Sequence, residues 1–409
     1  MTPALVALLA PLFGDDVSVR NLRVLTGGAS RTTYAFDAVT GTGSHALILR
    51  TAPPAEHYAG LELEAAAQAA AADAGAPVPR ILIASDSTSP LGDPFLLCEE
   101  VAGETIVRRI QRGLDDTGRG RLLEQCAGAL AAIHRASTDA PGLAELDQLA
   151  QYRGRLDEMG DTTATFEWAF RWLAQHRPAA SAPVLVHGDF RMGNLIVDGS
   201  DLKAVLDWEL VHVGEIYEDL AWFCVRAWRF GAPAELAAGG LGSIDDFLAG
   251  YRRAGGAAVD RETLHWWQVL ATLKWGVICR VQAERHLSGE TPSVELAAIG
   301  RRVCENEWDI LDLLSGPTMP PTEPPPVPPR PLPERDIRGG LHGRPTAAEL
   351  VAAVAGFLDG EVRAGTTGAV NFHALVAANA LRIVERELLD DTAAEPLAAL
   401  RRLGYPSEA

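Results

Sequence analysis

One stretch of the chain, Leu185 to Glu209, constrains the fold more than any other. It contains the sequence LVHGDFRMGNLIVDGSDLKAVLDWE. Two short apolar segments, 195–197 and 204–206, lie on either side of the turn residues 199–201. Apolar segments of this length around a Gly-Ser-Asp turn are typical of a β-hairpin. We therefore predict a hairpin here, with a loop before it that contains His-Gly-Asp.

Three polar residues lie in this loop and at the two ends of the predicted hairpin. Asp189 is in the loop, Asn194 precedes the first strand, and Asp207 follows the second. Mg²⁺ prefers oxygen ligands, and phosphoryl transfer to an alcohol needs a carboxylate that can accept the hydroxyl proton. We therefore expect Asp189 to be the base, and Asn194 and Asp207 to be metal ligands. The alternative is a solvated hairpin whose Asp and Asn residues only cap turns, and the complete pattern disfavours it.

The pattern formed by His187-Gly188-Asp189, Asn194 and Asp207-Trp208-Glu209 resembles the catalytic signature of the aminoglycoside phosphotransferase family. That family is kinase-like, with HGD in place of HRD and a D-x-E-type segment in place of DFG. The resemblance covers roughly residues 20 to 310. It implies an α+β, bilobal protein-kinase-like fold, with a small β-rich N-lobe and a helical C-lobe. It also implies a Mg²⁺-dependent kinase that transfers phosphate from ATP or GTP to a hydroxyl of a small molecule.

A turn of small residues follows the first predicted strand, Leu22 to Thr26. It contains Gly27, Gly28 and Ser30, and the next predicted strand begins at Thr33. Backbone N–H groups of such a turn can bind nucleotide phosphates, and the Ser30 hydroxyl is a further donor. We expect this turn to be the phosphate loop, although an ordinary hairpin turn would have the same composition.

The third predicted strand ends at Arg50, where kinase-like folds have a phosphate-binding lysine. The chain has only two lysines, Lys203 and Lys274, and both lie far downstream. Arginine binds phosphate oxygens bidentately and stays charged, so Arg50 is expected to replace the lysine. The resemblance selects Glu64 as its partner, in a helix predicted over 61–73. The alternatives are a surface arginine on an edge strand and a glutamate that compensates the helix dipole.

The resemblance also assigns supporting residues. Glu99 and Val101 would lie in the hinge and contact a purine through their backbone, although a plain strand-to-helix connection is the alternative. The His187 ring is expected to fix the loop through hydrogen bonds to nearby backbone, and Asp219 to brace the catalytic loop. The aromatic segment 152–172 is predicted to be one helix, whose rings form core or line an acceptor pocket.

Composition excludes several classes of protein. The formal net charge of −18 argues against a nucleic-acid partner, which requires clusters of Lys and Arg. The N-terminus lacks the basic and long apolar parts of a signal peptide, and no window is a convincing membrane span. The five cysteines form no C-x-x-C pair. We read them as reduced thiols in a cytoplasmic protein.

The chain is expected to divide into four parts. They are an N-lobe over 1–100, a C-lobe over 101–315, a proline-rich linker over 316–341 and a small all-α domain over 342–409. The linker is predicted from ten prolines within 317–333, a composition typical of semi-rigid polyproline segments. The last part shows no catalytic pattern, so we expect a role in docking or homodimer formation.

Two questions stay open at this stage. The missing lysine also fits a catalytically inactive kinase-like binding module, although the Asp189, Asn194 and Asp207 set favours an enzyme. The acceptor could be an aminoglycoside or other antibiotic, choline, an amino sugar or a hydroxyacyl compound. The order of residues 185–230 resembles the branch of the family associated with acyl-CoA dehydrogenases, which favours a hydroxyacyl acceptor.

Overall fold

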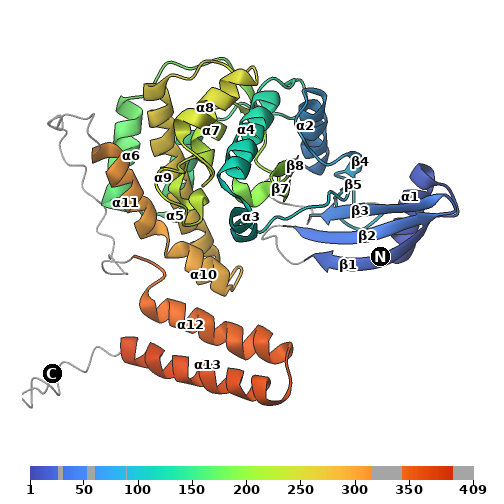
Figure 1. Cartoon of the computed structure of the whole chain (residues 1–409). Coiled ribbons are helices and arrows are strands. Elements are labelled where there is room, and N and C mark those ends of the chain that lie inside the picture. Colours follow the sequence, from blue (N-terminus) through green and yellow to red (C-terminus); the bar gives the residue numbers. More distant parts are fainter. Residues whose placement is uncertain (26–30, 53–59, 89, 316–342, 390–409) are drawn as a thin grey trace, which may run out of the picture. The chain divides into compact units, whose positions relative to one another are not determined.

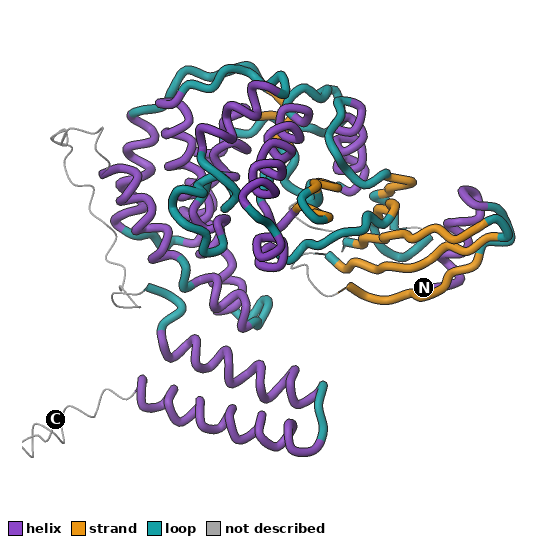
Figure 2. The backbone as a smooth tube through the Cα atoms, in the orientation of Figure 1, coloured by secondary structure: helices purple, strands orange, loops and turns teal. Residues whose placement is uncertain are grey.

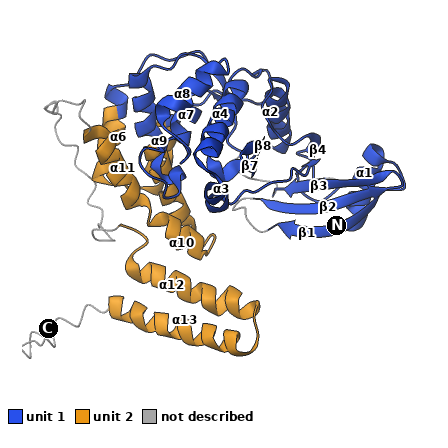
Figure 3. Cartoon of the chain, viewed as in Figure 1, with its two compact units in different colours: residues 1–148, 173–271 blue, residues 149–172, 272–409 orange. Residues whose placement is uncertain are grey.

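The computed structural model describes most of the chain as two compact units. The described ranges are 1–25, 31–52, 60–88, 90–315 and 343–389 (Figure 1). The expected phosphate-loop residues Gly27, Gly28 and Ser30 lie outside them, as does the proline-rich linker. Unit 1 contains residues 1–148 and 173–271, and unit 2 contains residues 149–172 and 272–409 (Figure 3).

Unit 1 begins with a five-stranded antiparallel sheet in the order β1-β2-β3-β5-β4 (Figures 1 and 2). The strands are β1 (Ser18–Leu25), β2 (Thr32–Thr40), β3 (Gly43–Thr51), β4 (Ile81–Ser85) and β5 (Phe95–Glu99). Alternating side chains of the inner strands face opposite sides of this sheet. In β3, Leu47 and Leu49 are fully buried, whereas Arg50 faces the other side.

A helix covers each face of the sheet. Helix α1 (Thr2–Phe13) contributes Leu5 and Leu9 to a core with Leu49 and Phe95. Helix α2 (Leu61–Asp73) packs on the opposite face, where its Leu61 joins Leu96 and Cys98. Because Arg50 shares the α2 face, the alternation of β3 directs its side chain toward the helix that contains Glu64.

Two short antiparallel strand pairs follow in the second half of unit 1. Strand β6 (Val184–Val186) pairs with β9 (His212–Gly214), and β7 (Leu195–Asp198) pairs with β8 (Asp201–Val205). The predicted hairpin is therefore present. The strands are connected at Gly199-Ser200, and Gly199 has the positive φ that this tight turn requires.

Helices make up the rest of unit 1. They are α3 (Val107–Gly113), α4 (Asp116–Ile133), α7 (Ile216–Phe223), the 3₁₀ segment η2 (Arg226–Arg229), α8 (Ile244–Arg253) and the first part of α9 (Arg261–Leu287). Helix α4 packs against α8 and against β8, so this long helix supports the hairpin that contains β8.

Unit 2 is entirely helical within its described residues. Its elements are most of α5 (Gln148–Met159), most of α6 (Ala164–Gln175), the rest of α9, α10 (Val294–Gly300), α11 (Val303–Ser315), α12 (Ala347–Phe357), a π-helical segment (Leu358–Val362) and α13 (Gly368–Leu389). The single helix predicted over 152–172 was wrong. The chain forms α5 and α6 instead, because Gly160 has a φ of 65° and ends α5 in a turn.

The fold class expected from the sequence is confirmed. The chain has the kinase-like fold, with a five-stranded antiparallel sheet, a helical lobe and an extra helical segment at its C-terminal side. Within the described ranges, no helix is both long and apolar enough to cross a membrane.

Candidate active site

The backbone of the catalytic loop is fixed by one buried carboxylate. The N–H groups of His187 and Gly188 donate to the two carboxylate oxygens of Asp219, at 2.8 and 2.9 Å. Gly188 has a φ of 83°, and a Cβ atom on it would lie 2.5 Å from the carbonyl oxygen of Leu210. Glycine is therefore required there both for its conformation and for its size. Asp219 lies on α7, so this helix sets the path of the loop.

Asp219 remains charged although it is fully buried. His134 Nε2 lies 3.3 Å from one of its oxygens, and the Tyr251 hydroxyl lies 2.8 Å from His134 Nδ1. Burial alone would raise the pKa of Asp219. The hydrogen bonds from His134 and from the loop backbone outweigh that effect and lower the pKa to about 2.

The His187 ring connects the loop to the hairpin. Its Nδ1 accepts from the N–H of Asp189 at 3.2 Å, and its Nε2 donates to the carbonyl of Leu206 at 3.0 Å. Burial lowers the pKa of His187 below its usual range. The ring of Trp208 lies against it, with 4.7 Å between ring centroids. The structure therefore places His187 as a neutral bridge between the loop and the strand end.

The carboxylate of Asp189 is held in one orientation by two buried donors. The indole Nε1 of Trp222 donates to its Oδ1 at 2.7 Å, and Nδ2 of Asn194 donates to its Oδ2 at 2.7 Å. The same Asn194 nitrogen also donates to the backbone carbonyl of Asp189 at 3.0 Å. Because Trp222 lies on α7 beside Asp219, one helix positions both the loop backbone and the reactive carboxylate.

Asn194 and Asp207, the two expected metal ligands, flank one hydrogen bond at the open end of the hairpin. The N–H of Leu206, directly before Asp207, donates to the carbonyl of Asn194 at 2.8 Å. The amide nitrogen of Asn194 points at Asp189, which leaves its amide oxygen for a cation. Asp207 has a φ of 68°, a left-handed conformation that is rare outside glycine and clusters at functional sites.

These oxygen donors fit Mg²⁺, which takes carboxylate and amide oxygens together with water and phosphate oxygens. Across the described ranges, no group of three or more His, Cys, Asp or Glu side chains could hold a metal ion. The expected pair is of another kind, because one of its two ligands is the amide oxygen of Asn194.

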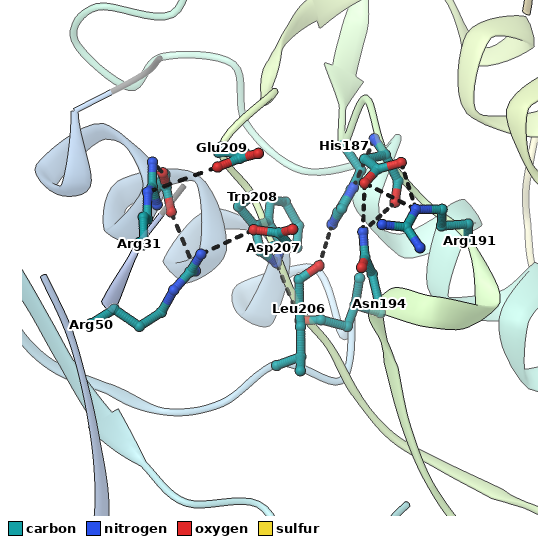
Figure 4. A network of polar contacts seen from close by, with 12 residues as sticks. Arg31, Arg50, His187, Arg191, Asn194, Leu206, Asp207, Trp208 and Glu209 are labelled. Atoms are coloured by element: carbon teal, nitrogen blue, oxygen red, sulfur yellow. Dashed lines mark hydrogen bonds and ion pairs between the residues drawn. The ribbon is translucent and has the colours of Figure 1, made fainter. Parts of the chain in front are cut away.

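A chain of alternating charges runs from Asp207 toward the sheet (Figure 4). Arg50 contacts Asp207 at 2.9 Å and Glu64 at 3.6 Å. Arg31 forms an ion pair with the other oxygen of Glu64, and its Nε lies 3.8 Å from Glu209. The structure therefore brings Arg50 to Glu64, the partner that the resemblance selected, and also to Asp207, a contact that the sequence analysis did not predict. The edge-strand interpretation of Arg50 was wrong, because β3 lies between β2 and β5.

Arg31 is a member of this network that the sequence analysis missed. Its side chain is only 4% exposed. Burial would lower the pKa of Arg31, but the hydrogen bond and charge of Glu64 outweigh burial and raise it. Its Nη1 is buried and has no hydrogen-bond partner among the described residues. The available signal was an arginine directly after the Gly-Gly turn in a chain without a lysine at the phosphate position.

Some backbone groups of the expected hinge residues already form hydrogen bonds within the sheet. The N–H of Glu99 donates to the carbonyl of Arg80 at 3.0 Å, and its carboxylate pairs with Arg80 at 2.9 Å. This N–H is not available to a purine, which restricts the expectation for Glu99 to its carbonyl. The backbone of Val101 makes no hydrogen bond to other backbone groups within the described part of the chain, so the expected purine contact through it stays a prediction.

Comparison with known proteins agrees with this geometry. Residues 21–263 match the model of the phosphotransferase enzyme family, and residues 364–408 match a domain of unknown function, DUF6285. A curated relative is acyl-CoA dehydrogenase family member 10 of Mus musculus. It is 31% identical over 195 residues, which is 44% of this chain and 18% of the relative. Family member 11 of Homo sapiens is 25% identical over 276 residues, 61% of this chain and 35% of the relative.

The chain thus spans only about a fifth to a third of these curated relatives. Two solved structures share the fold. A suspected aminoglycoside phosphotransferase of Ralstonia eutropha JMP134 has a TM-score of 0.62 at 22% identity, covering 76% of this chain and 98% of that chain. The aminoglycoside phosphotransferase APH(4)-Ia, solved with AMP-PNP and hygromycin B, has a TM-score of 0.52 at 18% identity, covering 76% and 99%. This chain belongs to the phosphotransferase enzyme family.

Proposed function

We propose that the protein is a Mg²⁺-dependent kinase that transfers the γ-phosphate of ATP or GTP to a hydroxyl of a small molecule. The observation that carries the proposal is that Asn194 contacts both the expected base and the strand that leads into Asp207. Its amide nitrogen orients the Asp189 carboxylate, while its backbone carbonyl is bonded to the strand end that leads into Asp207. The expected base and the expected metal ligands are thereby linked in one rigid unit, and phosphoryl transfer depends mainly on such positioning.

The reaction follows from these roles. The acceptor hydroxyl gives its proton to a carboxylate oxygen of Asp189 while its oxygen forms a bond to the γ-phosphorus. The bond from that phosphorus to the bridging oxygen of the β-phosphate breaks, and the nucleoside diphosphate leaves with the electron pair. A bound Mg²⁺ supplies neutralisation of the phosphate charge, and the oxygens of Asn194 and Asp207 would hold it.

The arginines support a nucleotide on the other side of the site. Arg50 is anchored by Glu64 and Asp207 in the place where kinase-like folds have a lysine. Arg31 has a buried N–H group that finds no acceptor in the described part of the chain. A buried donor of this kind is costly unless a bound ligand satisfies it, and a phosphate oxygen would do so.

For the acceptor we propose a hydroxyacyl compound rather than an aminoglycoside. The support comes from the curated relatives, which are named acyl-CoA dehydrogenase family members. Trp222 donates to Asp189 and packs on Trp228, and both indole rings are buried, so the base lies beside an apolar part of the core. Apolar surroundings favour an acyl chain over a polycationic sugar.

The test measures nucleoside diphosphate release with a panel of hydroxylated acceptors, including 3- and 4-hydroxyacyl thioesters, free hydroxy acids, choline and hygromycin B. We expect Mg²⁺-dependent release with a hydroxyacyl compound. Turnover with hygromycin B alone would refute the proposed acceptor class. If nucleotide binds but no acceptor in the panel is phosphorylated above the rate of hydrolysis, the kinase proposal fails and a binding module is favoured.

A further inference from the structure

The Asp189 carboxylate already has its hydrogen-bonding positions occupied. Beside the bonds from Trp222 and Asn194, the Nε of Arg191 lies 3.0 Å from Oδ1 and 3.2 Å from Oδ2. Each oxygen therefore has two donor contacts, and a carboxylate offers about four lone-pair positions in total. An alcohol that is to be deprotonated must approach one of these oxygens within hydrogen-bond reach. One of the three donors has to leave before the base can act.

The surroundings of the three donors decide which one leaves. Trp222 is buried in α7, and Asn194 is buried and also bonded to the backbone of the loop. Arg191 is different, because its side chain is 26% exposed and is carried on a long flexible stem. Arg191 is therefore the donor that can move without disturbing the fold.

The chain accommodates the folded-back position of Arg191. Its guanidinium lies over the ring of Trp228, 5.0 Å from the centroid. A Cβ atom on Gly193 would lie 2.3 Å from Nη1 of Arg191, so the glycine leaves the space that this side chain occupies. Arg191 thus has a defined resting position against Asp189, in which its guanidinium also makes a cation–π contact with Trp228.

We propose that Arg191 is a mobile cap on Asp189, and that the γ-phosphate of the bound nucleotide is the ligand that draws it away. This inference rests on the proposed kinase function. A guanidinium that leaves a carboxylate needs another oxyanion, and the γ-phosphate must lie beside the hydroxyl that Asp189 receives. Arg31 and Arg50 are already paired with acidic side chains, whereas the partner of Arg191 is the base itself. The base is then uncovered only when a triphosphate is present.

The test compares AMP-PNP with ADP by isothermal titration calorimetry in the presence of Mg²⁺, without any acceptor. We expect the wild-type protein to bind AMP-PNP about tenfold more tightly than ADP, the effect of a charge-assisted hydrogen bond. Arg191→Met keeps the apolar stem and removes the charge, so this preference should disappear while the Kd for ADP changes less than about twofold. Arg191→Lys should retain part of the preference, because a lysine makes a point contact.

A matched control is Arg155→Met, which removes another arginine that lies over an aromatic ring, 5.3 Å from the centroid of Tyr152. It should leave both affinities unchanged. A wild-type preference that survives in Arg191→Met, or no preference in the wild type, would overturn the inference while leaving the kinase proposal standing. Failure of the wild type to bind either nucleotide would instead overturn the proposed function.

Fluorescence follows the movement itself. Because Arg191 contacts Trp228, its departure should change tryptophan emission on addition of AMP-PNP but not of ADP. The change should be absent in Arg191→Met and in Trp228→Phe. Equal changes with both nucleotides in the wild type would show that the cap does not respond to the γ-phosphate, and would refute the inference.

Discussion

Two halves of the site are held together in different ways. The catalytic loop is fixed by backbone N–H groups that donate to buried Asp219, and by a neutral His187 ring. The nucleotide half is a chain of ion pairs in which Arg50 contacts both Glu64 and Asp207. The first half offers its ligand one carboxylate in a fixed orientation. The second half offers charged groups that a nucleotide and a cation can compete for.

This difference indicates a division of labour. Groups that orient a reacting atom gain from many short hydrogen bonds to buried partners, because displacement by even about 1 Å lowers the rate. Groups that bind phosphate gain from partners that they can exchange, because the ion pairs then also satisfy the charges while no ligand is bound. Apart from the proposed cap Arg191, substitutions in the first half should lower turnover or stability, and substitutions in the second half should weaken nucleotide affinity.

The largest effect is expected for Asp189→Asn. The amide cannot accept the hydroxyl proton, so kcat should fall about 10²- to 10⁴-fold. The Kd for ADP should stay within about twofold, because the ion pairs of Arg50 are untouched and ADP lacks the γ-phosphate that Arg191 would meet. Steady-state kinetics and calorimetry measure the two quantities. Asp198→Asn, an exposed change in the same hairpin, is the matched control. Near-native turnover of Asp189→Asn would show that Asp189 is not the base.

The next largest effect is expected on stability, for Asp219→Asn. An amide oxygen can replace only one of the two carboxylate oxygens that accept from His187 and Gly188, and its NH₂ group would face the other N–H. Loss of a buried charged acceptor should lower the free energy of unfolding of the loop by about 3 kcal/mol. Amide hydrogen exchange at His187 and Gly188 measures this locally. Unchanged protection would mean that the helix, rather than the carboxylate, holds the loop.

The same carboxylate predicts an acid limit. The pKa of Asp219 is about 2 in the folded protein, below its ordinary value of 3.8. A lowered pKa contributes stability that is fully present above the ordinary value and is lost as the pH falls toward the lower one. The contribution is about 2 kcal/mol. The stability gap between wild type and Asp219→Asn should therefore begin to close below about pH 4, and a gap that widened there would contradict the assignment.

Substitutions in the nucleotide half should change the affinity for nucleotide. Arg50→Met should raise the Kd for the Mg²⁺-nucleotide complex about tenfold or more, because it removes a charged phosphate donor. Arg31→Met should have a comparable effect if its buried N–H meets a phosphate. Arg50→Lys should restore most of the affinity. Arg20→Met, an exposed change in the same sheet, should have no effect. If Arg50→Met loses turnover while its nucleotide affinity is unchanged, the two halves of the site do not have the separate roles described above.

The sequence predicted the parts of the site that depend on local pairing. The hairpin places Asn194 and Asp207 by strand register, and the spacing of the motif already specifies that register. The alternation of β3 likewise placed Arg50 on the face of α2. The hairpin is local, so turn residues and periodicity were sufficient to find it, whereas Arg50 and Glu64 were selected by the resemblance to kinase-like folds.

Contacts that depend on distant packing were missed. Trp222 donates to Asp189 across 33 positions, and a tryptophan on an apolar helix face is ordinarily core. Arg31 became part of the network only because α2 buries Glu64 beside it. The break between α5 and α6 was also missed, since the apolar spacing of the two helices runs on across the turn at Gly160.

The smallest expected effect concerns the proton on His187, and it sharpens the contrast between a neutral and an ionic half. Its Nδ1 accepts from the backbone while its Nε2 faces a carbonyl, so the proton must be on Nε2. Burial lowers its pKa below the ordinary 6.5, so the ring should be mostly neutral at pH 6.5. The resulting stability is present above pH 6.5 and is lost as the pH falls further. Nitrogen-detected NMR of histidine rings should show the Nε2–H tautomer of His187 at pH 6.5. An imidazolium signal at that pH would mean that the catalytic loop, like the nucleotide half, is held by charge.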